Sequence, residues 1–170
     1  MAFSDHTLEL AKIEDLAVCA ALMDEGRAFQ RQQGFVQWTE DYPNRDTVKA
    51  DIHRQTGYVL KSGGEIAGYL CVDFDGDPAY DEIKGRWGAE EPYAVVHRMA
   101  FSGAFRGRGL ADVAFGLVGA LCLTRNVKHI RIDTDASNRR MQHILVKNGF
   151  VYRGTVLFQG SEKLAYDKAL

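Results

Sequence analysis

The sequence predicts an α/β fold in which a mixed β-sheet packs against helices. Segments with the alternating apolar pattern of strands stand before, between and after segments with the apolar spacing of helices, an order typical of an α/β sandwich. The chain has 170 residues, which suits one domain and is enough to bury a core. We therefore expect a single domain over residues 1–170.

The composition is that of a globular protein. Apolar residues make up 46% of the chain and charged residues 26%, which are ordinary proportions. Apolar runs stay short of the ~18 residues of a membrane span, and the N-terminus lacks a signal-peptide pattern, so we expect a cytoplasmic protein with no membrane partner. Cys19, Cys71 and Cys122 stand in apolar surroundings without the spacing of metal ligands, which predicts buried free thiols and no metal site.

Short elements and an aromatic loop make up the first part of the chain. Residues 7–10 have the pattern of a strand, and residues 13–31 place apolar side chains on one helix face. Residues 35–43 are aromatic without a period, which predicts an ordered loop. Asn44 is the expected N-cap of the next helix, and Gly57 follows the end of that helix.

A hairpin and a long connection come next. Residues 58–61 and 66–73 have the composition of strands and flank the sequence Ser-Gly-Gly-Glu, a strong turn signal. Residues 75–92 contain acids, glycines and aromatic residues without a period. We expect a long loop there, and such loops are usually functional or mobile.

The centre of the predicted fold is a strand, a loop and a helix within residues 95–125. Residues 95–101 are the strand, and residues 102–109 form a basic loop that contains Gly107 and Gly109. The helix after this loop is predicted by an apolar series at i, i+3, i+4 and i+7, which consists of Leu110, Val113, Ala114, Leu117, Val118 and Leu121.

The last part of the chain completes the sheet. Residues 129–134 alternate like a strand, and a helix that starts near Asn138 ends at Gly149, its expected C-cap. Residues 150–158 and 163–168 form a closing hairpin.

The loop before the long helix suits a pyrophosphate, because unpaired backbone N–H groups and the positive end of a helix dipole meet there. Arg106 and Arg108 add positive charge. A glycine-rich connection with solvated arginines is the alternative. A P-loop is excluded because Leu110 stands where a Lys is needed, and a dinucleotide fingerprint is excluded because Asp112 stands at its third Gly.

The run Arg106-Gly107-Arg108-Gly109-Leu110-Ala111 resembles the Gln/Arg-x-x-Gly-x-Gly/Ala acyl-CoA signature of the GNAT superfamily of N-acyltransferases. The run Lys147-Asn148-Gly149-Phe150 resembles the Lys-x-Gly-Phe ending of that family's next helix, and the order of elements matches from about Thr7 onward. The resemblance implies a three-layer sandwich with a mixed, mostly antiparallel sheet. It also implies transfer of an acetyl group from acetyl-CoA to a primary amine of a small molecule or peptide.

The resemblance further implies which residues hold acetyl-CoA. Backbone groups of the central strand would pair with the pantetheine arm, and one N–H would polarise the thioester carbonyl. Amides of residues 107–111 would hold the pyrophosphate. Asn138 matches a position that often contacts the cofactor, with an N-cap as its alternative role. The whole cofactor set is Met99, Ala100, Phe101, Arg106, Gly107, Arg108, Gly109, Leu110, Ala111 and Asn138.

His97 is the expected general base. It lies four residues before Phe101, so a period of two puts it on the same face of the sheet as Met99 and Phe101. Its spacing to Arg106 resembles that of arylalkylamine acetyltransferases, in which a histidine takes up the proton of the amine through water. A histidine with a structural role is the alternative.

The general acid stays open. Many members of the family carry a Tyr four residues before the Gly of the helix ending, and Leu145 stands at that position here. Either the thiolate leaves unprotonated or another donor serves, such as Tyr152 or His143. The same departure favours a rival reading, a non-catalytic acyl-CoA-binding or regulatory module.

The acceptor side is predicted from charge and aromatic residues. Residues 1–100 hold 18 acidic and 10 basic side chains, whereas residues 101–170 hold 5 acidic and 11 basic ones, which favours an amine in the first part and a polyanionic cofactor in the second. Solvated surface is the alternative for the charges, and a small core under the loops is the alternative for the aromatics. The candidates for binding the amine through cation–π contacts are Trp38, Tyr42, Tyr80, Trp87 and Tyr93.

The sequence thus predicts an acetyl-CoA-dependent N-acetyltransferase with an amine acceptor. A nucleotide-binding domain is disfavoured by the missing Lys and third Gly. Arg139, Arg140 and Lys147 form too small a basic patch for nucleic acid. Homodimers are common among proteins of this shape, so a homodimer is a further expectation.

Overall fold

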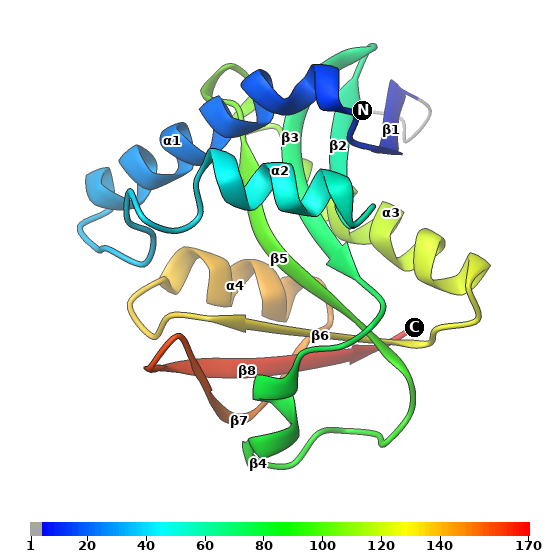
Figure 1. Cartoon of the computed structure of the whole chain (residues 1–170). Coiled ribbons are helices and arrows are strands. Elements are labelled where there is room, and N and C mark those ends of the chain that lie inside the picture. Colours follow the sequence, from blue (N-terminus) through cyan, green and yellow to red (C-terminus); the bar gives the residue numbers. More distant parts are fainter. Residues whose placement is uncertain (1–4) are drawn as a thin grey trace. The chain divides into compact units, whose positions relative to one another are not determined.

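A computed structural model describes residues 5–170 of the chain (Figure 1). The strands are β1 (His6–Leu10), β2 (Gly57–Ser62), β3 (Glu65–Asp73), β4 (Lys84–Gly85), β5 (Tyr93–Phe101), β6 (His129–Thr134), β7 (Val151–Phe158) and β8 (Ser161–Ala169). The helices are α1 (Leu16–Gln32), α2 (Arg45–His53), α3 (Leu110–Thr124) and α4 (Arg139–Lys147), with 3₁₀ turns η2 (Ile13–Asp15), η3 (Pro78–Glu82) and η4 (Gly103–Phe105).

The strands form one mixed sheet in the order β1-β2-β3-β5-β6-β8-β7-β4. The β5–β6 pair is parallel, and the β1–β2, β2–β3, β6–β8, β7–β8 and β4–β7 pairs are antiparallel. This confirms the predicted α/β class with a mixed, mostly antiparallel sheet.

Contacts within the chain group it into two compact units. One unit takes Met1–Val72 and Arg98–Leu117, and the other takes Asp73–His97 and Val118–Leu170. Each unit is built from two separate stretches, because β5 and α3 each contribute residues to both. The expectation of a single domain over residues 1–170 stays a prediction.

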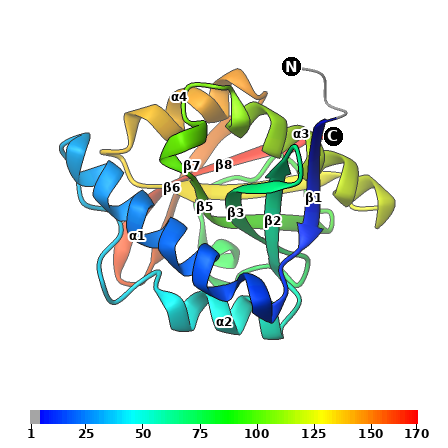
Figure 2. The ribbon, with the colours of Figure 1, turned by 90° about the horizontal axis from the view of Figure 1, so that it is seen from above.

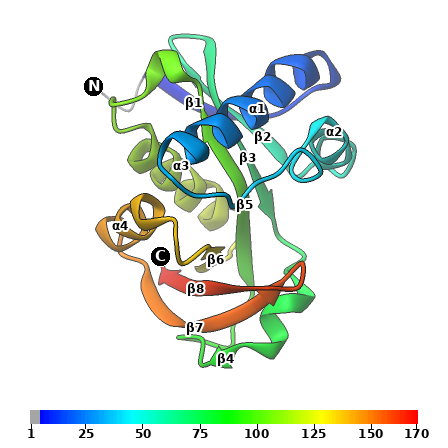
Figure 3. The same cartoon turned by 90° about the vertical axis from the view of Figure 1, so that its left-hand side faces the viewer.

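The first unit has three layers. Figures 1 and 2 show α1 and α2 side by side along one face of β2 and β3, and Figure 3 shows the start of α3 on the opposite face. Val59 packs with the residues of α1 and α2, whereas its neighbour Leu60 packs with Leu110 and Ala114 of α3. Consecutive residues of a strand point to opposite faces, so β2 alone supplies both cores.

The second unit contains a correction to the predicted loop at residues 75–92. This stretch contains η3 and β4, and β4 pairs with β7 through Lys84↔Thr155 and Gly85↔Gly154. Tyr80 and Trp87 are buried in one cluster with Val95, Val156 and Ala165. Two large buried side chains therefore anchor the stretch and give it regular structure.

Other expectations were met with small shifts. The helix predicted over residues 13–31 begins as η2 and becomes α-helical at Leu16. Asn44 caps α2, because its side chain accepts a hydrogen bond from the backbone N–H of Thr47. Cys19, Cys71 and Cys122 are buried free thiols, as predicted. None of the helices within residues 5–170 is long and apolar enough to cross a membrane.

Candidate active site

Strand β5 parts from its parallel neighbour before it ends. The register pairs are Tyr93↔His129, Ala94↔Ile130 and Val95↔Arg131, and β6 continues beyond the last pair to Thr134. Ladder pairing with β6 is therefore confined to the first three residues of β5.

Arg98 interrupts the regular course of β5. Its φ is +56°, in the left-handed region that non-glycine residues rarely adopt. A residue of this conformation inside a strand acts as a bulge and breaks the alternation of side chains. His97 was predicted to share a face with Met99 and Phe101 on the basis of unbroken alternation, and the alternation is broken at Arg98.

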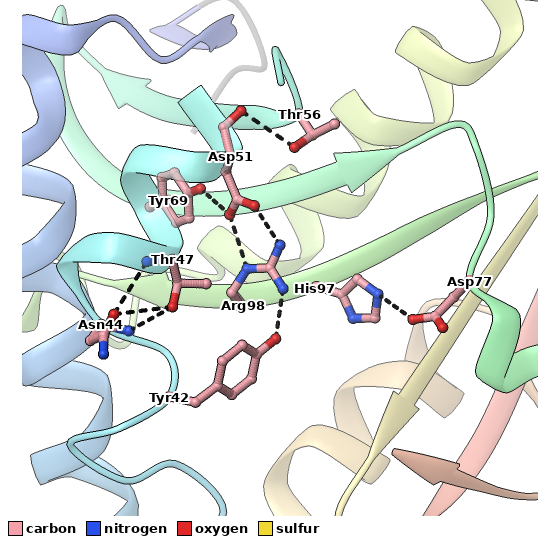
Figure 4. A network of polar contacts seen from close by, with 9 residues as sticks. All are labelled: Tyr42, Asn44, Thr47, Asp51, Thr56, Tyr69, Asp77, His97 and Arg98. Atoms are coloured by element: carbon pink, nitrogen blue, oxygen red, sulfur yellow. Dashed lines mark hydrogen bonds and ion pairs between the residues drawn. The ribbon is translucent and has the colours of Figure 1, made fainter. Parts of the chain in front are cut away.

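The side chain of Arg98 lies in a buried polar network of the first unit (Figure 4). Its Nε and Nη2 donate to the two carboxylate oxygens of Asp51 at 2.9 and 2.6 Å. Tyr69 donates its hydroxyl to the same carboxylate at 2.6 Å, and Tyr42 accepts from Nη1 of Arg98 at 2.7 Å. Asp51 is 3% exposed, so this ion pair is sealed from solvent.

Burial raises the pKa of Tyr42 and that of Tyr69 above the ordinary value of a phenol. Both hydroxyls therefore keep their protons at neutral pH, and Tyr69 acts as a donor to Asp51. Tyr42, a predicted acceptor-binding residue, is half-buried and is tied to β5 through Arg98. Sequence reasoning missed Asp51 and Tyr69, because nothing local marks a contact between residues so far apart in the chain.

The glycine loop between β5 and α3 is open to solvent. Gly107 and Gly109 have φ of +78° and +69°, and a Cβ at Gly107 would meet no atom within 4 Å. These positions therefore require glycine for backbone conformation rather than for lack of space. The first helical bond of α3 runs from Val113 N–H to the carbonyl of Gly109, so the N–H groups before it face the loop.

Helix α1 fixes the shape of this loop. Glu25 accepts a hydrogen bond from the backbone N–H of Gly103 at 2.8 Å, and the guanidinium of Arg106 lies 4.0 Å from the ring centre of Phe29. Glu25 and Phe29 are one turn apart on α1, so the helix presents both to the loop. The predicted cofactor residues Met99, Phe101 and Leu110 also pack in one cluster in this unit.

His97 lies in the second unit, and Figure 4 shows its ring facing the carboxylate of Asp77. Its Nε2 is 3.2 Å from Oδ2 of Asp77, and the two side chains are 14% and 16% exposed. The ring of Phe158 stacks on the imidazole at 5.5 Å between ring centres, and the ring of Tyr80 lies at 6.3 Å. The imidazole is thus held in place and still reaches solvent.

Three aromatic candidates for acceptor binding are engaged within the second unit. Tyr80 is fully buried and donates its hydroxyl to Asp133 at 2.6 Å. Trp87 donates its indole N–H to the carbonyl of Tyr80, and the guanidinium of Arg131 lies over the rings of Trp87 and Tyr93 at 4.4 and 3.9 Å. The guanidinium of Arg131 already lies on the rings of Trp87 and Tyr93, where an amine cation was expected to bind. This favours the alternative of a small core under the loops.

Trp38 shows the same kind of packing in the first unit. It is half-buried against the cluster of α1 and α2, and its backbone N–H donates to the side chain of Gln30 at 2.9 Å. A Cβ at Gly26 of α1 would come within 2.6 Å of the Trp38 ring. Glycine in the middle of this helix is therefore needed to admit the indole ring.

Similarity to known proteins shows which family the chain belongs to. The family model described as Acetyltransferase (GNAT) family matches residues 13–150. The chain belongs to the GNAT acetyltransferase family. No curated protein sequence matches it significantly. Membership of the family supports acetyl transfer as the chemistry of the chain.

Solved structures agree with the family. A GNAT acetyltransferase from Streptococcus agalactiae is 34% identical in sequence to this chain, with a TM-score of 0.88. The match covers 100% of this chain and 98% of the Streptococcus protein. A GNAT acetyltransferase from Listeria monocytogenes is 20% identical with a TM-score of 0.77, covering 97% and 95%. AAC(6')-Ib, solved with ribostamycin and coenzyme A, is 20% identical with a TM-score of 0.72, covering 97% and 93%, and likewise shows the shared fold.

The remaining predicted residues of this GNAT acetyltransferase have clear local roles. Asn138 caps α4, because its side chain accepts from the backbone N–H of Met141 at 3.1 Å. Leu145, at the position of the family Tyr, is fully buried. Tyr152 is 53% exposed, and its ring lies edge-on to Tyr166 at 5.7 Å. The described residues contain no group of metal-ligating side chains.

Proposed function

We propose that the chain is an N-acetyltransferase that moves the acetyl group of acetyl-CoA directly to a primary amine of a small molecule or peptide. The observation that carries the proposal is the exposed glycine loop at the start of α3, which combines the acyl-CoA signature with two glycines at positive φ. Membership of an acetyltransferase family supports it.

Acetyl-CoA fits the residues of this loop. The N–H groups of residues 107–111 would hold the pyrophosphate, because they precede or open the first turn of α3. Arg106, held against Phe29, and the exposed Arg108 would supply positive charge. The backbone of residues 99–101 would pair with the pantetheine arm, and Asn138 would add a contact from the start of α4. Structures of AAC(6')-Ib with coenzyme A and with acetyl-CoA support this choice of ligand.

The chemistry needs few groups, because acetyl-CoA supplies an activated thioester. His97 takes a proton from the amine, and a backbone N–H of residues 99–101 polarises the carbonyl. The amine nitrogen forms a bond to the acetyl carbon, the carbon–sulfur bond breaks, and coenzyme A leaves as a thiolate. Tyr152 is the proposed donor of a proton to this thiolate.

We propose that Tyr42 and Trp38 lie on the acceptor side. Tyr42 keeps an ordered position through Arg98, and Trp38 is half-buried rather than sealed. Tyr80, Trp87 and Tyr93 would shape the surroundings of His97 more than they touch the amine, because their rings already pack with each other and with Arg131.

The test is the release of free thiol from acetyl-CoA by the purified chain, with a panel of amines that includes aminoglycosides, amino acids and peptides. Amine-dependent release with an acetylated product identified by mass would support the proposal. Thermal unfolding with acetyl-CoA at ~100 times its Kd should show a stabilisation of about 2.7 kcal/mol. For a domain of this size that is a shift of roughly 5–10 °C.

One observation favours a second candidate, an acyl-CoA-binding module without catalysis. Leu145 is fully buried at the position where many family members carry a proton-donating Tyr. This reading predicts the thermal shift with acetyl-CoA and with coenzyme A but no thiol release with any amine. No thermal shift with either ligand, in folded protein, would contradict both candidates.

A further inference from the structure

The imidazole of His97 is held from three sides within its unit. Oδ2 of Asp77 lies 3.2 Å from Nε2, the ring of Phe158 stacks at 5.5 Å, and the ring of Tyr80 is tilted at 6.3 Å. Stacking restricts the plane of the ring, and the carboxylate selects which nitrogen faces it. Three side chains therefore fix the position and orientation of this imidazole, which is more than a solvated surface histidine usually has.

Asp77 is itself fixed by its neighbours. Its Oδ1 accepts a hydrogen bond from the backbone N–H of Ala79 at 2.9 Å, which makes it the N-cap of η3. Its own backbone N–H donates to the hydroxyl of Tyr93 at 3.3 Å. Gly76 has a φ of +82°, and a Cβ there would come within 2.9 Å of that hydroxyl. The carboxylate cannot turn away from His97 without losing its cap.

Other charged groups near His97 are engaged elsewhere. Asp133 accepts from Tyr80 at 2.6 Å, and burial raises the pKa of this carboxyl group. Lys163 donates to Asp135 at 2.9 Å. The carboxylate at hydrogen-bond distance from the imidazole is therefore that of Asp77.

We propose that Asp77 is a positioning residue that sets the tautomer of His97. Neutral His97 gives its Nε2 proton to a hydrogen bond with Asp77, which leaves Nδ1 as the nitrogen that accepts the proton of the amine, directly or through water. When this proton arrives, the carboxylate faces the imidazolium that forms. The inference rests on the proposed function for the role of His97 as base, but the tautomer can be measured without turnover.

The same chain offers a matched control. Nε2 of His129 lies 3.1 Å from Oε2 of Glu91, the same kind of pair at nearly the same distance. Glu91 is 61% exposed, whereas Asp77 is 16% exposed and caps η3. Breaking the His129 pair therefore removes an equivalent contact that the proposal does not use.

The first experiment compares Asp77→Asn with Glu91→Gln. The Asn side chain keeps an oxygen for the cap on Ala79 and turns an amide N–H₂ toward His97, which favours the opposite tautomer. We expect kcat to fall on the order of 10²–10⁴-fold, as general-base catalysis and its orienting carboxylate are lost. The KM for acetyl-CoA should stay within about twofold, and Glu91→Gln should match the unchanged protein. Equal activity of Asp77→Asn and Glu91→Gln would overturn the proposal.

A double variant separates positioning from a merely structural role. If Asp77 acts through His97, adding Asp77→Asn to His97→Ala should lower kcat no further. A further fall on the order of tenfold or more in the double variant would show that Asp77 does not act through the imidazole and would overturn the inference.

The readout independent of turnover is ¹⁵N NMR of the histidine side chains. We expect His97 to carry its proton on Nε2 in the unchanged chain and on Nδ1 in Asp77→Asn, with His129 unaffected. An Nδ1-protonated ring in the unchanged chain would overturn the inference even if the enzyme is active. If His97 has the predicted tautomer but the chain releases no thiol with any amine, the proposed function is overturned. The inference that Asp77 sets the tautomer of His97 would then still stand.

Discussion

His97 and Arg98 are consecutive residues of β5, and each has an aspartate as its charge partner, but the two pairs differ in construction. Arg98 makes two hydrogen bonds to Asp51, which is 3% exposed and also accepts from Tyr69. His97 makes one contact with Asp77, and both side chains keep some exposure. The Arg98–Asp51 pair is buried and joined by two hydrogen bonds, whereas the His97–Asp77 pair has one contact, which involves one of the two ring nitrogens.

The difference follows from the cost of burying charge. A sealed ion pair is stable only while every partner is present, because a single remaining buried charge has no compensation. Such a network suits a bulge that must keep one shape. His97 makes a single charge contact and its side chain is 14% exposed, so no such buried network depends on it. We therefore expect loss of the Asp51 pair to lower stability and loss of the Asp77 pair to lower turnover.

The largest effect on stability is expected from Asp51→Asn. The substitution leaves the guanidinium of Arg98 buried without a carboxylate, which should cost about 3–5 kcal/mol. The melting temperature should fall on the order of 10 °C. Asp24→Asn is the control, because Asp24 pairs with Arg27 but is 72% exposed, and its loss should cost less than about 1 kcal/mol. Equal melting temperatures for the two variants would contradict the comparison.

His97→Ala should show the reverse pattern. We expect kcat to fall on the order of 10²–10⁴-fold because the general base is lost. The thermal shift caused by acetyl-CoA should persist, and the loss of stability should be smaller than that of Asp51→Asn. Steady-state kinetics and thermal unfolding of the same preparations measure both effects. Unchanged turnover across the pH range would remove His97 from the mechanism.

Two substitutions at Arg98 sharpen the role of its backbone. Arg98→Gly and Arg98→Ala both remove the guanidinium, so they differ in how well they tolerate a φ of +56°. The free energy of unfolding of the Arg98→Gly variant should exceed that of the Arg98→Ala variant by about 1–2 kcal/mol, because alanine has a steric penalty in the left-handed region. Denaturant unfolding measures this difference. Glycine usually weakens a strand, so its advantage here can come only from the left-handed conformation. If the alanine variant is equally or more stable, residue 98 does not keep that conformation once the arginine side chain is removed.

Tyr42→Phe should give the smallest effect. It removes the hydroxyl that accepts from Arg98 and should cost about 1 kcal/mol. Tyr152→Phe serves as the control for unfolding, because the Tyr152 side chain is 53% exposed. If Tyr42 also lies on the acceptor side, its variant should raise the KM for the amine more than the KM for acetyl-CoA. A change in the KM for acetyl-CoA alone would place Tyr42 elsewhere.

Features that depend on neighbouring residues could be predicted from the sequence. The apolar series from Leu110 gave the face of α3, and Asn44 gave the N-cap of α2. Gly107 and Gly109 marked the loop between β5 and α3, and the structure adds that both have positive φ. Backbone conformation and helix period are set within a few residues, so local patterns contain this information.

Features that depend on distant contacts could not be predicted in this way. The left-handed conformation of Arg98 has no local signal, because it is held by Asp51, 47 residues away. Glu25 reaches Gly103 across 78 residues. Asp77 faces His97 because Tyr93 and the cap on Ala79 fix its turn. Trp87 and Tyr93, two of the aromatic residues predicted to bind a cation, already have one in Arg131, which comes from β6.

Local motifs and the order of elements were enough to predict the family, the class of the sheet and the glycine loop. The tertiary structure decided which aspartate serves Arg98 and which serves His97, and which aromatic rings are core. Packing brings together side chains that are far apart in the chain, and their burial then determines whether a charged pair stabilises the fold or remains available for proton transfer.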